Sequence, residues 1–289
     1  MAHLRDEVRR MCLSLYAKQS IRMPKKINCS IAGIPFSIYS DSNEPIQWLE
    51  ENLHAFISKS HPILKFYLQH KKGIHRLSQL PEVKWEKDSF EIRLNGFCIN
   101  GNIPAGKVHV QTRHRWAVGE LLRTFFSIYL IKREGFLLHA SCIMHKGGAY
   151  VFSGPSQSGK TTIARLASGR PVLTDESIAI VRRSGTYRAF ATPFYGEFGM
   201  INKNINGKIK ALFFIEKSNR FSHERLTSLN AHLELFKNII LRGRNIMLIK
   251  DLFNTFSKFT NTVPCFKLSF RNGHGIWGYL DENITPILS

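Results

Sequence analysis

Residues 154–161 form the stretch of this sequence whose residue types and spacing most directly indicate chemistry. They read Gly-Pro-Ser-Gln-Ser-Gly-Lys-Thr and match the pattern G-x-x-x-x-G-K-[ST] without a gap. Glycines let backbone N–H groups close around phosphate oxygens, where a larger side chain would collide. Lys160 can reach the β- and γ-phosphates of a nucleotide, and the Thr161 hydroxyl can ligate magnesium. The pattern therefore predicts a phosphate loop for ATP and Mg²⁺.

The flanking residues provide the structural context that this motif requires. Apolar residues 149–153 precede the loop and suit a buried strand, and residues 161–167 suit a helix. A helix that begins at the loop directs its partial positive charge toward the bound anion. We assign nucleotide binding to one continuous set of residues: Gly154, Pro155, Ser156, Gln157, Ser158, Gly159, Lys160, Thr161 and Thr162.

Three further features lie where phosphoryl transfer would need them. Asp175 and Glu176 end the strand-like run 171–174, and strand-end carboxylates beside a phosphate loop can hold magnesium or accept a hydroxyl proton. Such a pair is also common as a solvated turn. His139 lies on the run before the loop strand, where a histidine is more often a packed core residue than a catalyst. Glu197 lies in a turn flanked by proline and glycine, which suits a metal ligand or a simple surface position.

The composition indicates a folded protein and limits its compartment. The 289 residues, 43% of them hydrophobic, can form one large domain or two ordinary ones. The five cysteines are dispersed without a C-x-x-C pair, which fits reduced thiols better than a disulfide framework or a zinc site. The N-terminus is a poor signal peptide. The longest apolar run, around residues 121–131, is interrupted by Arg123 and is too short to span a bilayer. We expect a cytoplasmic protein.

The charge of the chain favours anionic partners in general. Lys and Arg number 41 against 21 Asp and Glu, which gives a formal net charge of +20. The basic residues are spread along the chain, and no helix-turn-helix, zinc-finger or aromatic–basic RNA signature is evident. An acidic peptide or small protein is therefore favoured over nucleic acid as the main partner.

Hydrophobic periodicity divides the chain into two units, residues 1–134 and 135–289. The first predicts a small α+β domain. It has a basic helix at 1–26, a hairpin from 27–31 and 34–38, a helix that starts at 41–45, several strand-like runs between 74 and 113, and a joining helix at 116–132. The second predicts strands at 136–144, 149–153, 171–174, 178–181, 188–191, 209–216, 265–270 and 276–280, with helices at 161–167, 229–241 and 246–259. One helix after the loop, followed by hairpin-like strands, predicts a mixed sheet rather than a strictly alternating α/β one.

Residues 135–193 resemble the core of the HPr kinase/phosphorylase family, whose fold is shared with ATP-dependent phosphoenolpyruvate carboxykinase. The similar features are a strand ending in His-Ala, the phosphate loop, a helix, and a strand ending in two acids. The tail, including VPCFKLSF, is similar to diverged kinases of this group, some of which are encoded with lasso-type peptide clusters and phosphorylate serine in a precursor peptide. The resemblance implies a mixed-sheet α/β P-loop kinase domain, with the preceding α+β domain serving substrate selection, and it is compatible with a homo-oligomer.

The resemblance also implies roles for individual residues. Lys160 and Thr161 match the phosphate-binding lysine and the magnesium-ligating hydroxyl. Asp175 matches the acid that takes the proton from the substrate serine. His139 matches the histidine close to the reacting phosphate.

Two acids of the family pattern are altered or displaced in this chain. Glu176 stands where the family usually has a second aspartate, and Glu197 matches a metal-side glutamate in the segment E-I-R-G-x-G. Residues 197–200 read Glu-Phe-Gly-Met, so the arginine is missing. This departure argues against the reverse, phosphorolytic reaction and against HPr as the substrate.

The sequence thus favours an ATP- and magnesium-dependent kinase that acts on a serine hydroxyl of a peptide or protein. A precursor of a modified natural product is one candidate acceptor. Two alternatives stay open: a kinase for a small molecule such as free serine, and a nucleotide-sensing regulatory module without turnover.

Overall fold

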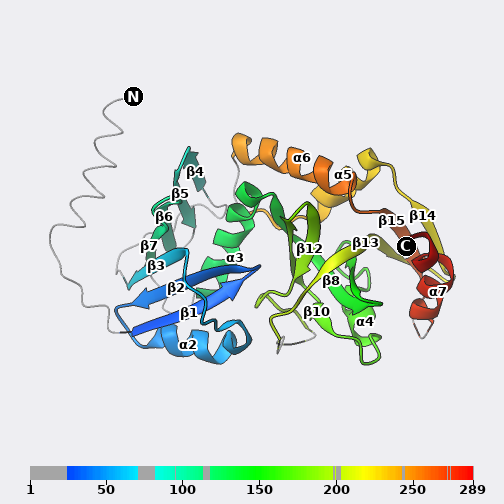
Figure 1. The fold of residues 1–289 in the computed structure, drawn as a ribbon, viewed down its shortest axis with the longest axis horizontal. Coiled ribbons are helices and arrows are strands. Elements are labelled where there is room, and N and C mark those ends of the chain that lie inside the picture. The colour runs from blue at the N-terminus through cyan, green and yellow to red at the C-terminus, as the bar shows by residue number, and fades with distance from the viewer. Residues whose placement is uncertain are drawn as a thin grey trace.

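The structure is a computed structural model that describes residues 25–70, 82–94, 96–112, 118–197, 199, 203–242, 245–271, 273 and 275–288. The basic helix expected at residues 1–26 lies outside these residues, except that Lys25 and Lys26 begin a strand. Figure 1 shows two sheets side by side, with the first on the left of the view and the second on the right.

The first sheet has the strand order β1-β2-β3-β7-β6-β5-β4. Its strands are β1 (Lys25–Ile31), β2 (Ile34–Ser40), β3 (Leu64–His70), β4 (Glu82–Glu86), β5 (Ser89–Leu94), β6 (Phe97–Asn102) and β7 (Lys107–Thr112). Strand β3 runs parallel to both of its neighbours, β2 and β7, and the remaining pairs are antiparallel. The expected hairpin is confirmed, because β1 and β2 pair across a turn at Ala32 and Gly33, both with positive φ. Helix α2 (Glu44–Asn52) and the short helix η1 (His54–Phe56) follow β2.

The second sheet is mixed, as the sequence predicted. It consists of β8 (Gly135–His145), β9 (Gly148–Ser153), β10 (Val172–Thr174), β11 (Ser177–Arg183), β12 (Thr186–Phe190), β13 (Asn206–Lys217), β14 (Ser222–Arg225) and β15 (Cys265–Phe270). Strands β8, β11, β12, β13 and β9 each pair with the next, and β9 pairs back with β8. These five strands therefore close a ring. Beyond it, β15 lies parallel to β13, which itself is parallel to β9.

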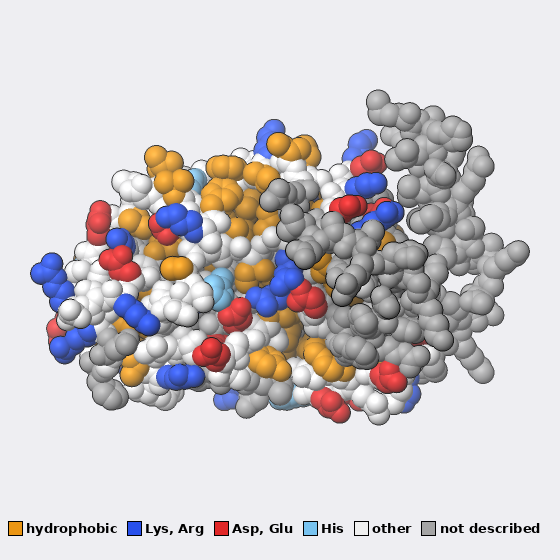
Figure 2. Space-filling view, turned by 180° about the vertical axis from the view of Figure 1, so that it is seen from behind, with side chains coloured by type: hydrophobic (Ala, Val, Ile, Leu, Met, Phe, Trp, Pro, Cys, Tyr) orange, Lys and Arg blue, Asp and Glu red, His pale blue; other side chains and the backbone are white. Residues whose placement is uncertain are grey.

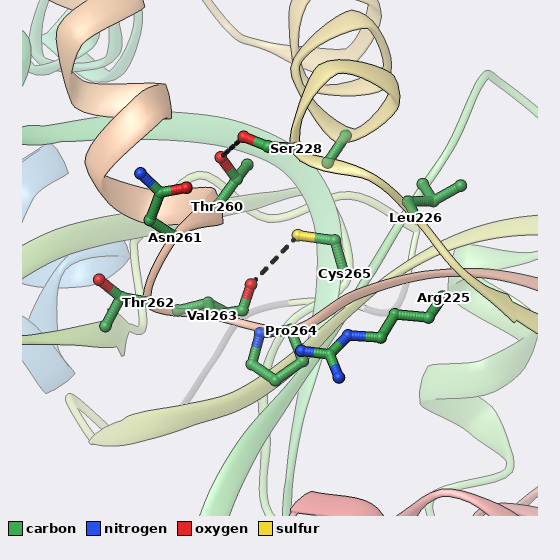
Figure 3. A pocket seen from close by; sticks show the side chains of 10 residues that line it. Arg225, Leu226, Ser228, Thr260, Asn261, Thr262, Val263, Pro264 and Cys265 are labelled. Carbon is green, nitrogen blue, oxygen red and sulfur yellow. Dashed lines mark hydrogen bonds between the residues drawn. The ribbon is translucent and has the colours of Figure 1, made fainter.

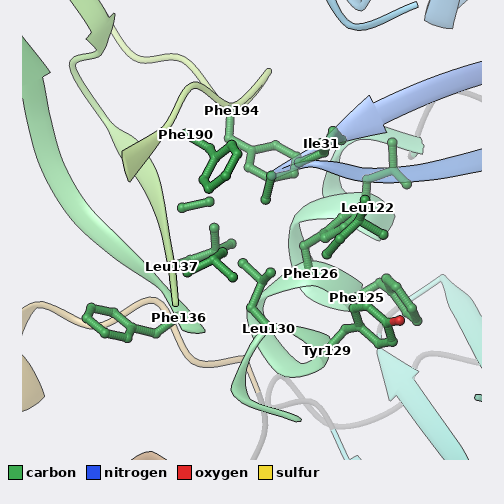
Figure 4. Close-up of a cluster of buried hydrophobic side chains, with 14 of the residues drawn as sticks. Ile31, Leu122, Phe125, Phe126, Tyr129, Leu130, Phe136, Leu137, Phe190 and Phe194 are labelled. Carbon is green, nitrogen blue, oxygen red and sulfur yellow. The ribbon is translucent and has the colours of Figure 1, made fainter. Parts of the chain in front are cut away.

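Helix α3 (Val118–Tyr129) lies between the two sheets. Figure 4 shows Phe125 and Tyr129 of α3 facing the first sheet, while Leu130, which directly follows the helix, lies near Leu137 of the second. Phe125 packs edge-on against Phe66, with ring centroids 4.9 Å apart. Full burial of each such side chain stabilises the fold by about 1.5–3 kcal/mol. The short helix η2 (Ile131–Arg133) then leads into β8.

Two longer helices cover the second sheet, α5 (Ser228–Asn238) and α6 (Ile246–Thr260). Helix α6 begins after Asn245, whose side chain accepts hydrogen bonds from the N–H groups of Met247 and Leu248, as a capping residue does. Its face packs on the sheet through Phe256 and Phe259, both of which contact the ring of Phe136.

The last predicted strand, residues 276–280, is wrong, because these residues belong to helix α7 (Ile276–Asn283). The buried side chains of Ile276, Trp277, Leu280 and Ile284 recur at helical spacing. A short apolar run cannot be assigned to strand or helix by composition alone, and here the spacing decides. A short helix η3 (Thr285–Leu288) follows α7.

One hydrophobic cluster of buried residues extends from Ile27 in the first sheet to Cys265 in the second. The boundary expected between residues 134 and 135 stays a prediction, since the two sheets share this core. A second cluster joins α7 to the outer face of β9, β13 and β15.

Candidate functional site

The predicted phosphate loop follows β9 and leads into helix α4 (Lys160–Arg165), which is shorter than the helix expected at residues 161–167. Pro155, Ser156 and Gln157 form the exposed crest of the loop. The loop lies at the carboxyl ends of the parallel strands β9, β13 and β15, the edge at which open α/β sheets bind ligands.

Lys160 is held inside the loop. Its side chain is buried, and Nζ donates hydrogen bonds to the backbone oxygens of Gly154 and Pro155, both at 2.8 Å. An ammonium group carries three protons, so a third donor remains for a phosphate oxygen. Burial lowers the pKa of Lys160, and the charge of Glu176 acts in the opposite direction. The lysine is therefore positioned by the loop itself and sits within electrostatic reach of the acid pair.

Gly159 is required by both conformation and packing. Its φ is +107°, in the left-handed region that side chains rarely adopt, and a Cβ there would lie 2.4 Å from Cζ of Phe270. Nearby, the Ser158 hydroxyl is buried and has no hydrogen-bond partner in the described structure. An unpaired buried hydroxyl beside the loop backbone fits a hydrogen bond to a phosphate oxygen.

The strand register places His139 between the loop and the acid pair. Strand β8 is flanked by β9 on one side and by β10 and β11 on the other. Ser153, the last residue before the loop, pairs with Ala140, and Ser177, just after the acids, pairs with His139. Neighbouring strands lie about 4.8 Å apart, so the loop strand and the acid-bearing chain are about 10 Å apart, with β8 between them.

The two acids face different surroundings. The Thr174 hydroxyl accepts hydrogen bonds from the N–H groups of Glu176 and Ser177, both at 3.1 Å, and so fixes the turn that carries the acids. Asp175 is 2% exposed, and its Oδ1 accepts a hydrogen bond from the N–H of Gly196 at 3.0 Å. A Cβ on Gly196 would lie 3.1 Å from the other carboxylate oxygen of Asp175, so a glycine permits this close approach.

His139 contacts both the backbone and the side chain of Glu176. His139 Nδ1 lies 2.9 Å from the backbone oxygen of Glu176 and 3.4 Å from its Oε2. A carbonyl oxygen only accepts, so Nδ1 carries the proton and Nε2 of the neutral ring is an acceptor. Burial and then the charge of Lys160 lower the pKa of His139, while Glu176 raises it. The direction is downward, so the imidazole is neutral at pH 7.

Arg123 is the residue of this site that sequence reasoning did not assign. It lies on α3, and its Nη2 is 3.1 Å from Glu176 Oε1 and 3.1 Å from the Ser177 hydroxyl. Its Nε is buried without a hydrogen-bond partner in the described structure. The available signal was an arginine on the apolar side of a largely hydrophobic helix. Arg123 therefore ties the acid pair to the helix between the two sheets.

Glu197 is not brought into this cluster by any contact in the described structure. Its side chain is 83% exposed, and the nearest cation is Arg165, with Nη2 4.0 Å from Oε2. No group of three His, Cys, Asp or Glu side chains that could hold a metal occurs among the described residues. The expected metal role of Glu197 stays a prediction.

Two hollows lie elsewhere on the second sheet. One, of about 240 Å³, is bounded by α5, the end of α6 and the start of β15 (Figure 3). It lies near Cys265, at the edge of the sheet opposite the loop. The other, of about 480 Å³, is lined by Lys217, Ser218, Asn219 and Arg271 at the carboxyl ends of β13 and β15, on the edge of the loop.

The distribution of surface charge and the length of the helices are relevant to the expected partners. In Figure 2, basic side chains are scattered among acidic ones over the visible part of one face and form no single field there. No helix in the described ranges is long and apolar enough to cross a membrane.

These features define a mixed α/β protein in which a phosphate-loop motif faces a strand-end acid pair. A family model described as SynChlorMet cassette protein ScmC matches residues 111–285, which is more than half of the chain. The chain belongs to this family. No curated protein matches it.

Among solved structures, the chain is similar to the Hpr(Ser) kinase/phosphatase from Coxiella burnetii. The sequence identity is 11% and the TM-score is 0.30, and the match covers 52% of this chain and 95% of that chain. A TM-score this low supports no conclusion about chemistry.

Proposed function

We propose that this chain is an ATP- and magnesium-dependent kinase that transfers the γ-phosphate to a serine hydroxyl of a peptide or small protein. The observation that supports it is the placement of His139 on β8, between the phosphate loop and Asp175–Glu176. A phosphoryl-transfer site needs a cation at the phosphates and a base for the attacking hydroxyl within one small volume. Lys160 and Asp175 are the candidates for these two roles.

In the proposed reaction the chain acts mainly by positioning and by charge. Asp175 accepts the proton of the serine hydroxyl while the serine oxygen bonds to the γ-phosphorus, the bond to the bridging oxygen breaks, and ADP leaves. Lys160 offsets the charge that develops on the phosphates. The N–H of Gly196 orients the Asp175 carboxylate, and Arg123 holds Glu176 beside it.

The residues present could hold magnesium through only one or two oxygen ligands from the protein. Mg²⁺ commonly binds through one or two carboxylates, water and the phosphates of the substrate, so three converging acids are not required. The Thr161 hydroxyl and the acid pair supply oxygen ligands of this kind. Asp175 is assigned to the proton transfer and Glu176 is already paired with Arg123 and His139, so the Thr161 hydroxyl is the first candidate ligand and Glu176 the second. When bound, the ion would neutralise charge on the phosphates.

Other expectations from the sequence belong to this proposal. It includes an HPr kinase-like fold for residues 135–289, substrate selection by residues 1–134, a cytoplasmic location and a homo-oligomer. The net charge of +20 favours an acidic acceptor peptide over nucleic acid. The family description names a cassette, so serine-containing peptides encoded in the same cassette are the first acceptors to try.

The test is incubation of the purified chain with γ-labelled ATP and magnesium, with candidate peptides or free serine. Label in a peptide seryl residue, lost in a Lys160→Met variant, is the expected result. Label in free serine would point to a small-molecule kinase. Binding of ATP with no consumption in the presence of every candidate would favour a nucleotide-sensing module and contradict the kinase.

A further inference from the structure

The hollow lined by Lys217, Ser218, Asn219 and Arg271 is not used by the mechanism above. Lys217 is the last residue of β13, and Arg271 directly follows β15. Both strands run parallel and pair in register, with Lys217 opposite Phe270. Their carboxyl ends therefore bring the two cations together beside a polar amide and a hydroxyl.

This hollow lies on the same edge of the sheet as the phosphate loop. Strand β9, which leads into the loop, pairs in parallel with β13, and Ser153 lies opposite Phe214. Phe270, the neighbour of Arg271, packs its ring where a Cβ of Gly159 would lie. The hollow is on the β13–β15 side of the loop strand, and the acids are on the β8 side. A ligand anchored by phosphates in the loop can thus extend in either direction.

The lining residues suit a nucleoside. Within the described ranges, neither Lys217 nor Arg271 has a carboxylate within ion-pair distance. The guanidinium carbon of Arg271 lies 5.6 Å from the ring centroid of Phe221, which stacks on Tyr279 at 5.1 Å. A planar guanidinium held over an aromatic ring can stack on a base, and the Asn219 amide can both donate to and accept from a base edge.

We propose that this hollow receives the ribose and base of the nucleotide whose triphosphate lies in the loop. The inference rests on the proposed function. The γ-phosphate then points toward Asp175 and the nucleoside lies over the ends of β13 and β15. Arg271 stacks on the base, the Asn219 amide forms hydrogen bonds with the edge of the base, and Lys217 neutralises the phosphate nearest the ribose. The donor is consequently a nucleoside triphosphate rather than inorganic pyrophosphate.

The experiment compares the magnesium complexes of ATP and inorganic tripolyphosphate by calorimetric titration of the full chain. We use wild type, Arg271→Ala, Asn219→Ala and the control Lys250→Ala, an exposed cation on α6. Wild type should bind ATP more tightly than tripolyphosphate. Each hollow variant should weaken ATP binding about tenfold and leave tripolyphosphate binding and the melting temperature unchanged, since a stacked base contributes about 1–3 kcal/mol and a hydrogen bond to its edge about 1 kcal/mol.

The experiment distinguishes failure of the nucleoside-site proposal from failure of the kinase proposal. If wild type binds neither ligand, the nucleotide function itself is contradicted, and this inference with it. If ATP binds and both hollow variants match Lys250→Ala, the hollow is not the nucleoside site although the kinase stands. If the variants bind ATP normally and raise only the KM for an acidic peptide, the hollow holds the acceptor and the inference is overturned.

Discussion

Arg123 and Glu176 form an ion pair between α3 and the acid-bearing turn after β10, with Nη2 3.1 Å from Oε1. The same nitrogen also donates to the Ser177 hydroxyl. Both side chains are largely shielded from water, at 22% and 29% exposed, so solvent screens this pair less than it screens a surface ion pair. The helix between the two sheets thereby sets the position of the acids at the phosphate loop.

Replacing Arg123 should impair phosphoryl transfer more than it impairs nucleotide binding. Arg123→Met removes both hydrogen bonds, and we expect kcat to fall about 10- to 100-fold, since hydrogen bonds to charged groups contribute about 1.5–3 kcal/mol. Arg123→Lys keeps the charge without the planar fork and should recover only part of the rate. The measurement is kcat beside the Kd for ATP. An unchanged kcat in Arg123→Met would remove this residue from the site.

Gly159→Ala should destabilise the protein and abolish ATP binding. The new Cβ would meet the Phe270 ring at 2.4 Å and would also impose a positive φ on an alanine, which costs about 1–2 kcal/mol. The matched control is Gly169→Ala, where φ is +79° but nothing lies within 4 Å of the new Cβ. Thermal unfolding and ATP titration of both variants separate the clash from the backbone strain. Equal losses in the two variants would contradict a packing role for Phe270.

Asp175→Asn should keep ATP binding and lose turnover. The amide can still accept from the Gly196 N–H but cannot take the serine proton, and a general base contributes about 100- to 10 000-fold. ATP affinity and initial rate on a labelled peptide are the two measurements. Glu282→Gln is the comparison, because this carboxylate is exposed on α7 and has no role in the proposed site. Near-normal turnover in Asp175→Asn would remove this acid from the mechanism.

The pH dependence of His139 has a definite sign. Burial and the charge of Lys160 hold the pKa of His139 below its ordinary value of 6.5, so the neutral ring predominates at pH 7. The midpoint of protonation, and of any loss of rate caused by it, should lie below pH 6.5. An NMR titration of the His139 ring and a pH–rate profile measure this directly. A midpoint at or above 6.5 would contradict the environment described here.

Several elements could be predicted because their signals are local. The hairpin of β1 and β2, the phosphate loop between β9 and α4, and α6 follow from residue spacing and turn chemistry within single segments. Helix α7 was predicted as a strand because a short apolar run is ambiguous until its partners are known. The indole N–H of Trp277 donates to the Leu166 oxygen and so joins this run to the end of the loop helix, 111 residues away in sequence.

The candidate site likewise contains residues that the sequence could assign and residues that only the structure could assign. The acid pair was proposed from its position at a strand end and His139 from the family resemblance, and the register of β8 places them beside one another. Arg123 could not be assigned, because its partner is 53 residues away in sequence. The hollow of Lys217 and Arg271 likewise depends on the parallel pairing of β13 and β15.

The amino-acid sequence by itself determined that a phosphate-loop motif is present, since backbone freedom at glycine and the reach of one lysine are properties of eight consecutive residues. Only the tertiary structure decided which distant groups surround that loop. Contacts such as Phe270 with Gly159 and Arg123 with Glu176 join segments that are far apart in the chain, and only the pairing of strands and the burial of a shared core bring them together.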